Sequence, residues 1–402
     1  MELSKVLIIG GGSAGLYLAS LLDPAKYHIT IIEGQKTVGR KFLVAGKGGF
    51  NLSHSIAMEE MIMKYQPSEF MKPFISQHPS SSLIKYFIEL GINTYTGSSG
   101  KIFPKEGIKP AEVLSVIKSR LVDNNVDILT NTKWISTDQA TMIIAESENE
   151  KTIPYDVVVY ALGGASWKKT GSDGAWLETF RQMGLETKDF KASNCGVIVP
   201  WSDYFSKRWQ GFPVKNITLT CDGITEKGEI VITSSGIEGA PAYALNACLR
   251  KQPENKLLAL NLIPAISEHK AQAFKSKLKS KKSLNSILKN TLRLSDVKIA
   301  LIKELIDKET YQNRSSIEDN LKAIPIKVKG FSPIDEAIST VGGLELKEVD
   351  ENLMLKKYPG QYAIGEMLDW DAPTGGYLLQ ACFSMAAALA DHLNKEVPKQ
   401  KK

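Results

Sequence analysis

A discontinuous α/β fold is predicted by three features of this 402-residue sequence. A β-branched run at Lys5–Ile9 leads directly into a glycine-rich turn and a helical apolar pattern, which is typical of a nucleotide-binding domain. A second glycine-rich segment, 365–377, precedes a long helical pattern near the C-terminus. Between them, short alternating segments give way to helices rich in Lys and Leu. The outer segments are therefore expected to form one domain that is interrupted by an insertion.

The N-terminal elements have the length of one β-α-β unit. The strand Lys5–Ile9, a helix at Gly15–Leu22 and a strand at Ile29–Ile32 together span about thirty residues, as in a Rossmann-like domain. Further elements expected in this domain are a helix through Ala111–Leu121, a strand at Val126–Leu129, a hairpin at Trp134–Ser147, a strand at Val157–Leu162, a strand at Gln361–Ile364 and a closing helix at Gly376–Leu393. This predicts a parallel sheet with helices packed on it.

The middle of the chain has a different pattern of predicted strands and helices from the two ends. Turn signals separate short strands between Cys195 and Ala247, and helical spacing follows between Glu268 and Thr310. The expected domains are a nucleotide-binding domain at 1–191 and 340–402, a β-rich insertion at 192–255 and 322–339, and a helical subdomain at 256–321.

The first glycine turn has the form G-x-G-x-x-G in the context that this motif requires, after a strand and before a helix. Gly10 permits the tight turn, Gly12 lets a pyrophosphate approach the backbone, and Gly15 allows close packing of helix on strand. The N–H groups of Ser13 and Ala14 then lie at the electropositive start of the helix, where a phosphate is favoured. Glu33 ends the second strand and can accept both ribose hydroxyls, which favours FAD or NAD over NADP.

The second glycine-rich segment favours FAD, because two helix starts from opposite ends of the chain can then meet on one extended cofactor. Glu366 is placed to hydrogen-bond ribityl hydroxyls. The N–H groups of Gly376 and Tyr377 can stabilise negative charge on a reduced flavin. The other glycines expected to line the cofactor in this reading are Gly163, Gly365 and Gly375.

A third glycine-rich stretch, 38–53, is expected to hold its backbone close to the cofactor, through Gly46, Gly48 and Gly49. Arg40 and Lys41 either neutralise the pyrophosphate or lie in water. Three polar residues are candidates for contacts at the flavin ring, namely Lys47, Asn51 and Asp369. No dedicated catalytic acid or base can be assigned, because flavin itself carries the redox chemistry.

Composition limits the other function classes. The formal net charge is only +6, and the lysines between Lys270 and Lys282 lack interleaved aromatic residues, so they are read as a solvated helix face and nucleic acid is not expected as a partner. The four cysteines are far apart and form no C-x-x-C pair, so spacing indicates neither a metal site nor a disulfide framework. No apolar run is long enough for a membrane helix, and no secretory signal is apparent, which together predict a cytoplasmic protein.

These motifs resemble those of the BaiN-like or aminoacetone-oxidase-like NAD(P)/FAD-dependent oxidoreductases. The resemblance runs nearly end to end and is carried by the segments 8–15, 39–41, 46–51, 161–164, 170–174, 342–343 and 365–380. It implies FAD, and an FAD domain split by a β-barrel-like insertion that itself carries a helical subdomain. Most members of the family read Gly-Gly-Gly-Arg-Cys-Asn where this chain has Gly-Lys-Gly-Gly-Phe50-Asn51. The cysteine that such members place beside the flavin is therefore replaced here by Phe50.

The sequence thus predicts an FAD-dependent oxidoreductase acting on a small molecule. No second G-x-G-x-x-G follows a strand, so NAD(P)H is expected only as a transient reductant that docks at the flavin, unless the substrate itself reduces it. Two alternatives remain open. One is a tRNA-modifying flavoprotein that uses the lysine-rich helices, and the other is a non-catalytic, flavin-binding redox sensor.

Overall fold

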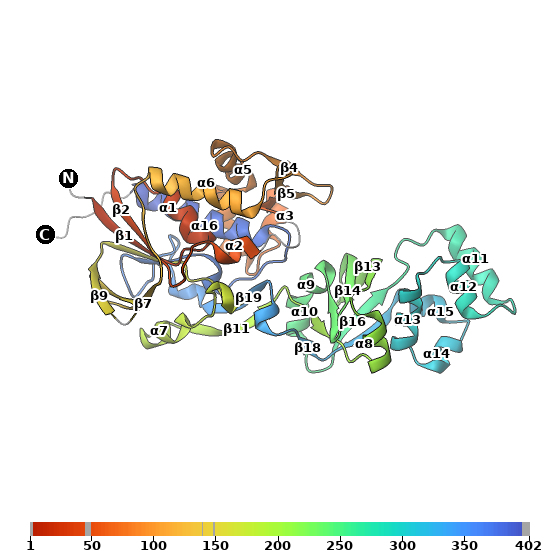
Figure 1. Ribbon diagram of the computed structural model, residues 1–402. Coiled ribbons are helices and arrows are strands. Elements are labelled where there is room, and N and C mark those ends of the chain that lie inside the picture. Colours follow the sequence, from red (N-terminus) through yellow and green to blue (C-terminus); the bar gives the residue numbers. More distant parts are fainter. Residues whose placement is uncertain (1–2, 45–49, 139, 148, 396–402) are drawn as a thin grey trace. The chain divides into compact units, whose positions relative to one another are not determined.

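The computed structural model describes residues 3–44, 50–138, 140–147 and 149–395. The chain divides into two compact units. The first comprises Met1–Lys191 and Ser339–Lys402, and the second Ala192–Ile338. Figure 1 labels helices and strands of both units where there is room.

The first unit is built on a five-stranded parallel sheet in the order β20-β10-β1-β2-β6. Its strands are β1 (Ser4–Ile9), β2 (Tyr27–Ile32), β6 (Asp127–Leu129), β10 (Val157–Tyr160) and β20 (Gln361–Ala363). The middle strand β1 is apolar, and its residues from Val6 to Ile9 are buried, because both faces of the sheet are covered. The predicted parallel α/β sheet is confirmed.

Helices from both ends of the chain pack together on this sheet. The helix α1 (Ser13–Leu21) lies beside α16 (Tyr377–Lys395) and α6 (Pro110–Asp123), so the red and blue helices of Figure 1 are neighbours. Almost every residue of α1 is buried, including Leu16 and Leu18. The C-terminal helix is thus an integral part of the N-terminal fold.

Smaller elements surround the parallel sheet. The predicted hairpin is the first part of a three-stranded antiparallel sheet, β7 (Thr132–Thr137), β8 (Thr141–Glu146) and β9 (Asn149–Pro154). The sequence did not indicate β9, because most of its residues are polar and exposed. The remaining elements are α2 (Arg40–Val44), β3 (Ser53–His54), α3 (Met58–Ile62), α4 (Ser68–Gln77), α5 (Ser80–Glu89), β4 (Thr94–Thr96), β5 (Lys101–Pro104), η2 (Lys168–Thr170), α7 (Trp176–Gln182), β11 (Thr187–Ser193), β19 (Ser339–Leu344), η4 (Leu346–Glu348) and η5 (Gly365–Met367).

The second unit contains a seven-stranded antiparallel sheet that curls towards closure. Its order is β17-β16-β13-β14-β15-β12-β18, with the strands β12 (Val197–Ile198), β13 (Pro213–Cys221), β14 (Ile224–Ile232), β15 (Gly236–Glu238), β16 (Lys256–Asn261), β17 (Ile324–Val328) and β18 (Gly330–Phe331). The two edge strands, β17 and β18, are separated in sequence only by Lys329. Because neighbouring Cα atoms are about 3.8 Å apart, the opposite edges of the sheet must meet at this residue. The sheet is therefore barrel-like, as the family resemblance implies.

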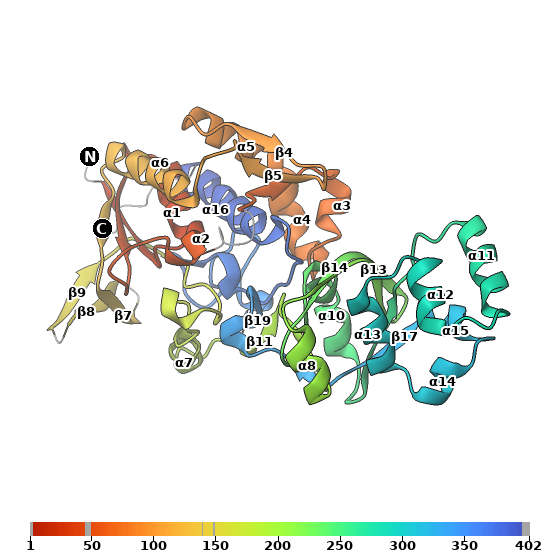
Figure 2. The same cartoon turned by 45° about the vertical axis from the view of Figure 1, so that its right-hand side comes forward.

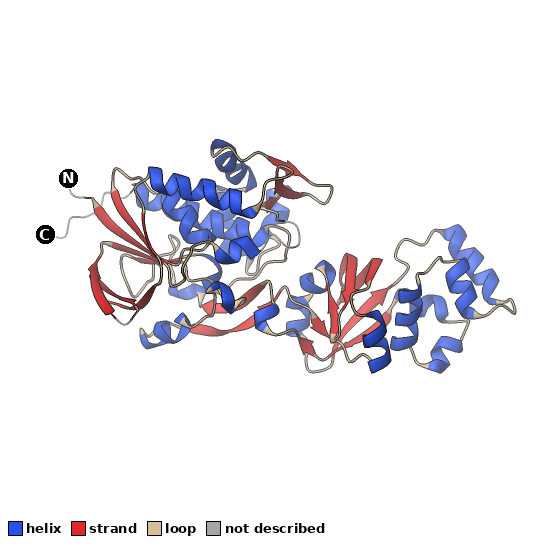
Figure 3. Cartoon of the chain, viewed as in Figure 1, coloured by secondary structure: helices blue, strands red, loops and turns tan. Residues whose placement is uncertain are grey.

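Helices occupy the rest of this unit. Those from α11 onward gather at one end of the sheet, as Figures 2 and 3 show. The bounds are α8 (Asp203–Trp209), α9 (Ala240–Ala244), α10 (Asn246–Lys251), α11 (Glu268–Leu278), α12 (Leu284–Asn290), α13 (Asp296–Leu305), α14 (Lys308–Gln312) and α15 (Ile317–Lys322). Their apolar faces share one core with the sheet, through residues such as Phe274, Leu288 and Leu301.

The core of the second unit also holds a lysine. The ammonium group of Lys298 on α13 donates to the carbonyl of Leu262 at 2.8 Å and to that of Asn216 at 3.1 Å. Burial lowers the pKa of Lys298 to about 8 from an ordinary 10.5. The folded protein therefore binds this proton less tightly than the unfolded chain does.

We expect the free energy of unfolding to depend on pH because of the lowered pKa of Lys298. Between the folded and the unfolded pKa the unfolded chain keeps the proton that the folded protein has lost, so the contribution of Lys298 to stability should rise with pH above about 8. Urea unfolding of the wild-type protein and of Lys298→Met, at about pH 7 and about pH 10, checks this. The difference between wild type and variant should move in favour of wild type at the higher pH, and a constant difference would contradict the expectation.

The cysteines correct one expectation. Spacing indicated no disulfide, but Cys221 at the end of β13 and Cys248 in α10 are joined in a disulfide, with their Cα atoms 6.3 Å apart. The hairpin of β13 and β14 and the helix α9 bring the two residues together over a separation of 27. Cys195 and Cys382 are buried and belong to no disulfide.

A membrane-spanning helix is not found in the described part of the chain, where no helix combines the length and the apolar character that a bilayer requires.

Candidate functional site

The predicted cofactor residues gather at one edge of the parallel sheet. The strands β1, β2, β10 and β20 run in the same direction, so their carboxyl ends lie together. The segments that follow these ends are Gly10–Gly15, Glu33, Ala161–Gly164 and Ile364–Glu366. Ligands of open α/β sheets bind at this edge, outside the carboxyl ends of the strands.

The three glycines of the motif have different surroundings. At each position these surroundings explain why the residue has no side chain. Gly10 has a φ of +109°, and a Cβ there would lie 2.4 Å from the carbonyl oxygen of Ala161. A Cβ on Gly15 would lie 2.2 Å from the carbonyl oxygen of Gly10. A Cβ on Gly12, in contrast, would meet no described atom within 4 Å. Gly10 and Gly15 are thus required by packing, whereas the space in front of Gly12 is open to a ligand.

The helix α1 presents its first turn to this space. Gly12 is the N-cap of α1 and supplies no side chain to cap the first N–H groups, which belong to Ser13, Ala14 and Gly15. Such N–H groups, together with the helix dipole, favour an anion. The first turn of α1 therefore has the groups that the predicted phosphate would need, and the phosphate position itself stays a prediction.

Glu33 folds back onto the glycine turn. Its Oε2 accepts a hydrogen bond from the N–H of Gly11 at 2.9 Å, and its Oε1 accepts one from the N–H of Gln35 at 2.8 Å. Burial raises the pKa of Glu33, and these two N–H groups oppose the rise. A carboxylate oxygen has room for a second hydrogen bond, so Glu33 can still accept from ribose hydroxyls.

Lys41 and Glu366 lie together, although the sequence suggested separate roles for them. The ammonium group of Lys41 donates to Oε2 of Glu366 and to Oγ of Ser166, both at 2.8 Å. The other oxygen of Glu366, Oε1, accepts from the N–H of Thr340 at 3.0 Å. Both charged side chains are largely shielded from water, with exposed fractions of 29% and 17%. This pair therefore places one cation and one anion at the edge of the sheet.

A double-mutant cycle should detect this pair. Lys41→Met, Glu366→Gln and the double variant are expected to give a coupling energy between about 0.5 and 3 kcal/mol in urea unfolding, because the two groups are close and shielded. The exposed pair Lys151–Glu146, which is 2.7 Å long, is the matched control, for which we expect less than about 1 kcal/mol. Equal coupling energies for the two pairs would contradict a special role of the Lys41–Glu366 contact.

Two buried donors at this edge have no hydrogen-bond partner among the described residues. They are Nε of Arg40 and Nδ2 of Asn51. The guanidinium of Arg40 is anchored through Nη2 on the carbonyl of Lys169 at 2.8 Å. Buried donors are nearly always satisfied in native proteins, so an acceptor-rich group is expected beside them. Both residues thus fit a dinucleotide that carries phosphate and ring carbonyl oxygens.

The start of α16 reaches the same region. A Cβ on Gly376, which has a φ of +101°, would lie 2.5 Å from the carbonyl oxygen of Ser53, so the start of this helix packs against β3. Gly365 packs against Ala14 in the first turn of α1, where a Cβ would lie 3.2 Å from that of Ala14. The N-terminal and C-terminal glycine segments are thus brought together, as the sequence predicted.

The other predicted residues are placed as follows. Asp369 binds Lys188 at 2.6 Å and the N–H of Gly342 at 3.1 Å, so both of its oxygens have protein partners, and its contact with the ring stays a prediction. Gly163 has a φ of +68°, and its carbonyl accepts from the indole of Trp176. Gly375 lies beside the side chain of Lys101. Gly46, Lys47, Gly48 and Gly49 lie outside the described residues.

Sequence reasoning missed three residues that support this site. Ser166 holds Lys41, Thr340 holds Glu366, and Ser53 donates from its Oγ to Oε1 of Gln380 in α16 at 2.5 Å. Ser166 lies shortly after the β10 strand end, which was a usable signal. The roles of Thr340 and Ser53 depend on contacts between distant segments, which no local pattern reveals.

Phe50 has a structural role where most family members place cysteine. Its ring packs edge-on against Phe42, with 4.8 Å between ring centres, and the side chain is buried. This position therefore contributes to the apolar core and supplies no thiol.

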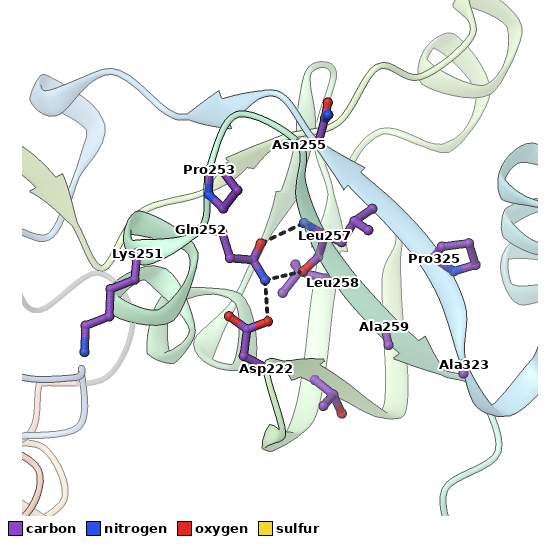
Figure 4. Close-up of a pocket in the computed structure, with 11 residues that line it drawn as sticks. Asp222, Lys251, Gln252, Pro253, Asn255, Leu257, Leu258, Ala259, Ala323 and Pro325 are labelled. Atoms are coloured by element: carbon purple, nitrogen blue, oxygen red, sulfur yellow. Dashed lines mark hydrogen bonds between the residues drawn. The ribbon is translucent and has the colours of Figure 1, made fainter.

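A separate hollow of about 530 Å³ lies in the second unit, beside Asp222 and Gln252 (Figure 4). The amide of Gln252 bridges Asp222 and both backbone groups of Leu257, so its hydrogen-bonding groups are already satisfied within the protein. None of the predicted site residues lines this hollow.

The chain is similar in sequence and in fold to known proteins. The chain is 24% identical over 409 residues to a ribosomal RNA dihydrouridine synthase of Haemophilus influenzae, covering 98% of this chain and all of that protein. It is 22% identical to the protein of the same name from Escherichia coli K12, over 98% of both chains. Among solved structures, 3-ketosteroid delta1-dehydrogenase from Sterolibacterium denitrificans has a similar fold, with a TM-score of 0.52 and 10% identity over 98% of this chain and all of that chain.

A flavocytochrome c3 fumarate reductase shares the fold as well, with a TM-score of 0.51 and 14% identity over 98% of this chain and 78% of that chain. The sequence model of the HI0933-like protein Rossmann domain matches residues 4–392, almost the whole chain. This protein therefore belongs to the HI0933-like family of flavoproteins with an FAD-binding Rossmann fold.

Proposed function

We propose that this protein is an FAD-dependent oxidoreductase that acts on a small molecule and takes electrons from NAD(P)H that docks only transiently. The observation that carries the proposal is the contact between the two glycine-rich segments, in which Gly365 packs against Ala14 in the first turn of α1, while Gly376 at the start of α16 packs against Ser53 of β3. A single extended dinucleotide suits this arrangement better than a compact ligand does.

The residues divide into two groups along such a cofactor. Glu33 and the first turn of α1 would hold the adenosine and the pyrophosphate, and Arg40 would neutralise phosphate charge with its unpartnered Nε. Glu366 would accept from ribityl hydroxyls, Asn51 would donate to the ring, and the start of α16 would favour negative charge near it. FAD, when bound, supplies the transfer of a hydride or of single electrons. Lys41 would hold the Glu366 carboxylate in place through its hydrogen bond to Oε2.

The test is an absorbance spectrum of the purified protein, followed by anaerobic titration with NADH and with NADPH. We expect a bound yellow flavin that either nucleotide bleaches and that a metabolite or a quinone re-oxidises. A protein that purifies with FAD but exchanges electrons with none of these would instead be a redox sensor. A colourless protein that takes up no FAD would contradict both readings.

A second candidate function is reduction of a uracil base in ribosomal RNA. The observation that favours it is the end-to-end match to two proteins of that name. In this reaction two electrons and two protons add across the C5=C6 bond of the base, with the hydride drawn from NAD(P)H and the proton from water. Phe50 means that a cysteine at that position does not supply the proton in this chain. Dihydrouridine formed on ribosomal RNA incubated with the protein and NADPH would support this candidate, and its absence would contradict it.

A further inference from the structure

We infer that the helix α11 and the loop after it bind the phosphate backbone of RNA, an inference that rests on the second candidate function. The surface consists of five lysines that project from this segment, and we call it the basic surface: Lys270, Lys277, Lys279, Lys281 and Lys282.

The positive charge of the chain is concentrated here. The segment from Glu268 to Lys322 contains thirteen Lys and Arg against seven Asp and Glu, so it carries a formal charge of +6. The whole chain also carries +6, which leaves the rest of the protein formally neutral. A charge confined to one subdomain points to a local polyanionic partner, because solubility alone would be served equally well by charge spread over the surface.

The lysines of the basic surface are exposed, and none of them has an acidic partner within 4 Å among the described residues. The acidic residues nearby form ion pairs with lysines outside the basic surface. Glu318 pairs with Lys322 and with Lys275, and Asp296 pairs with Lys289. Five ammonium groups thus remain available to phosphates.

The loop that carries three of these lysines is held by an arginine. The guanidinium of Arg314 donates from Nη1 to the carbonyls of Leu278 and Ser280, and from Nη2 to that of Lys282, at 2.7–2.9 Å. Ser280 adds a hydrogen bond from its hydroxyl to the carbonyl of Lys277. The backbone is therefore fixed while the lysine side chains point outward, which lowers the entropy lost when they bind a partner.

The helix dipole explains only part of this pattern. Cations are favoured in the last turn of a helix, which accounts for Lys277 and contributes at Lys279. It does not account for Lys270 in the first turn of α11, where a cation is disfavoured, or for Lys281 and Lys282 beyond the helix end. The presence of lysines at these three positions therefore needs an explanation other than the helix dipole.

RNA fits this surface better than a membrane does. A helix that lies on a bilayer inserts an apolar face, but the large apolar residues of α11, Phe274 and Leu278, pack into the protein core. The exposed positions are Lys, Gln, Ser, Glu and His. The contact is therefore electrostatic and suits a polyanion that stays in water.

The test compares two triple variants of equal charge. Lys279→Gln, Lys281→Gln and Lys282→Gln remove three contacts of the basic surface. Lys72→Gln, Lys105→Gln and Lys118→Gln remove three exposed, unpaired lysines of the first unit as the control. Binding of a fluorescein-labelled RNA hairpin is measured between about 50 and 200 mM salt. The slope of log K against log salt should fall by about 2 to 3 in the first variant and stay unchanged in the control.

Wild-type protein that does not bind the hairpin, or equal losses in both variants, would overturn the inference, as would binding to anionic lipid vesicles without binding to RNA. Thermal unfolding and FAD content should match wild type in both variants, which separates a surface effect from misfolding. Protein that binds RNA with this dependence but forms no dihydrouridine would contradict the second candidate function and leave the surface in place.

Discussion

A Gly12→Val protein is expected to fold and to purify almost without FAD. Gly12 has φ −81° and ψ −175°, an extended conformation that valine adopts readily, and no described atom lies within 4 Å of the added Cβ. The stability of the cofactor-free protein should therefore change by less than about 1 kcal/mol. The new side chain fills the space in front of the first turn of α1, so FAD affinity should fall by tenfold or more, at least about 1.4 kcal/mol.

Absorbance and thermal unfolding of cofactor-free protein measure the two effects separately. Gly15→Val is the contrasting variant, because its Cβ would lie 2.2 Å from the carbonyl oxygen of Gly10 and would disturb the packing of α1 on β1. It should lose both stability and FAD. A Gly12→Val protein that retains its yellow colour would contradict the position that we assign to the pyrophosphate.

Reduction of the Cys221–Cys248 disulfide is expected to destabilise the second unit by about 3.5 kcal/mol, because a cross-link over a separation of 27 residues restricts the unfolded chain by about that amount. Both sulfurs lie in the core that joins the sheet to its helices, so the effect should reach the whole unit. Urea unfolding with and without dithiothreitol gives the difference.

The double variant Cys221→Ala, Cys248→Ala is the control, since dithiothreitol should not change its stability further. Titration of the unfolded wild-type protein should find two free thiols, those of Cys195 and Cys382. Four free thiols in protein purified without reductant would show that the cross-link does not form.

The sequence patterns predicted those elements that are formed by residues close together in the chain. The run Lys5–Ile9, the glycine turn and the apolar spacing of α1 and α16 depend on residues close in sequence, and the structure agrees with each of them. The contact of Lys41 with Glu366 joins residues 325 positions apart, so neither its existence nor the part that Thr340 plays in it followed from a pattern. The strand β9 and the Cys221–Cys248 pair were missed for different reasons, because the strand has few apolar residues and the disulfide depends on a folded hairpin.

The two strands that connect the units, β11 and β19, are hydrogen-bonded neighbours. The chain therefore leaves the parallel-sheet domain and returns to it at almost the same place, and within the second unit Ile338 donates to the carbonyl of Asn194 near its two ends. A module whose ends meet can lengthen, shorten or be exchanged at little entropic cost to its host, since each doubling of such a loop adds only about 0.6 kcal/mol. The second unit can therefore change in length without a change in the parallel sheet of the first unit.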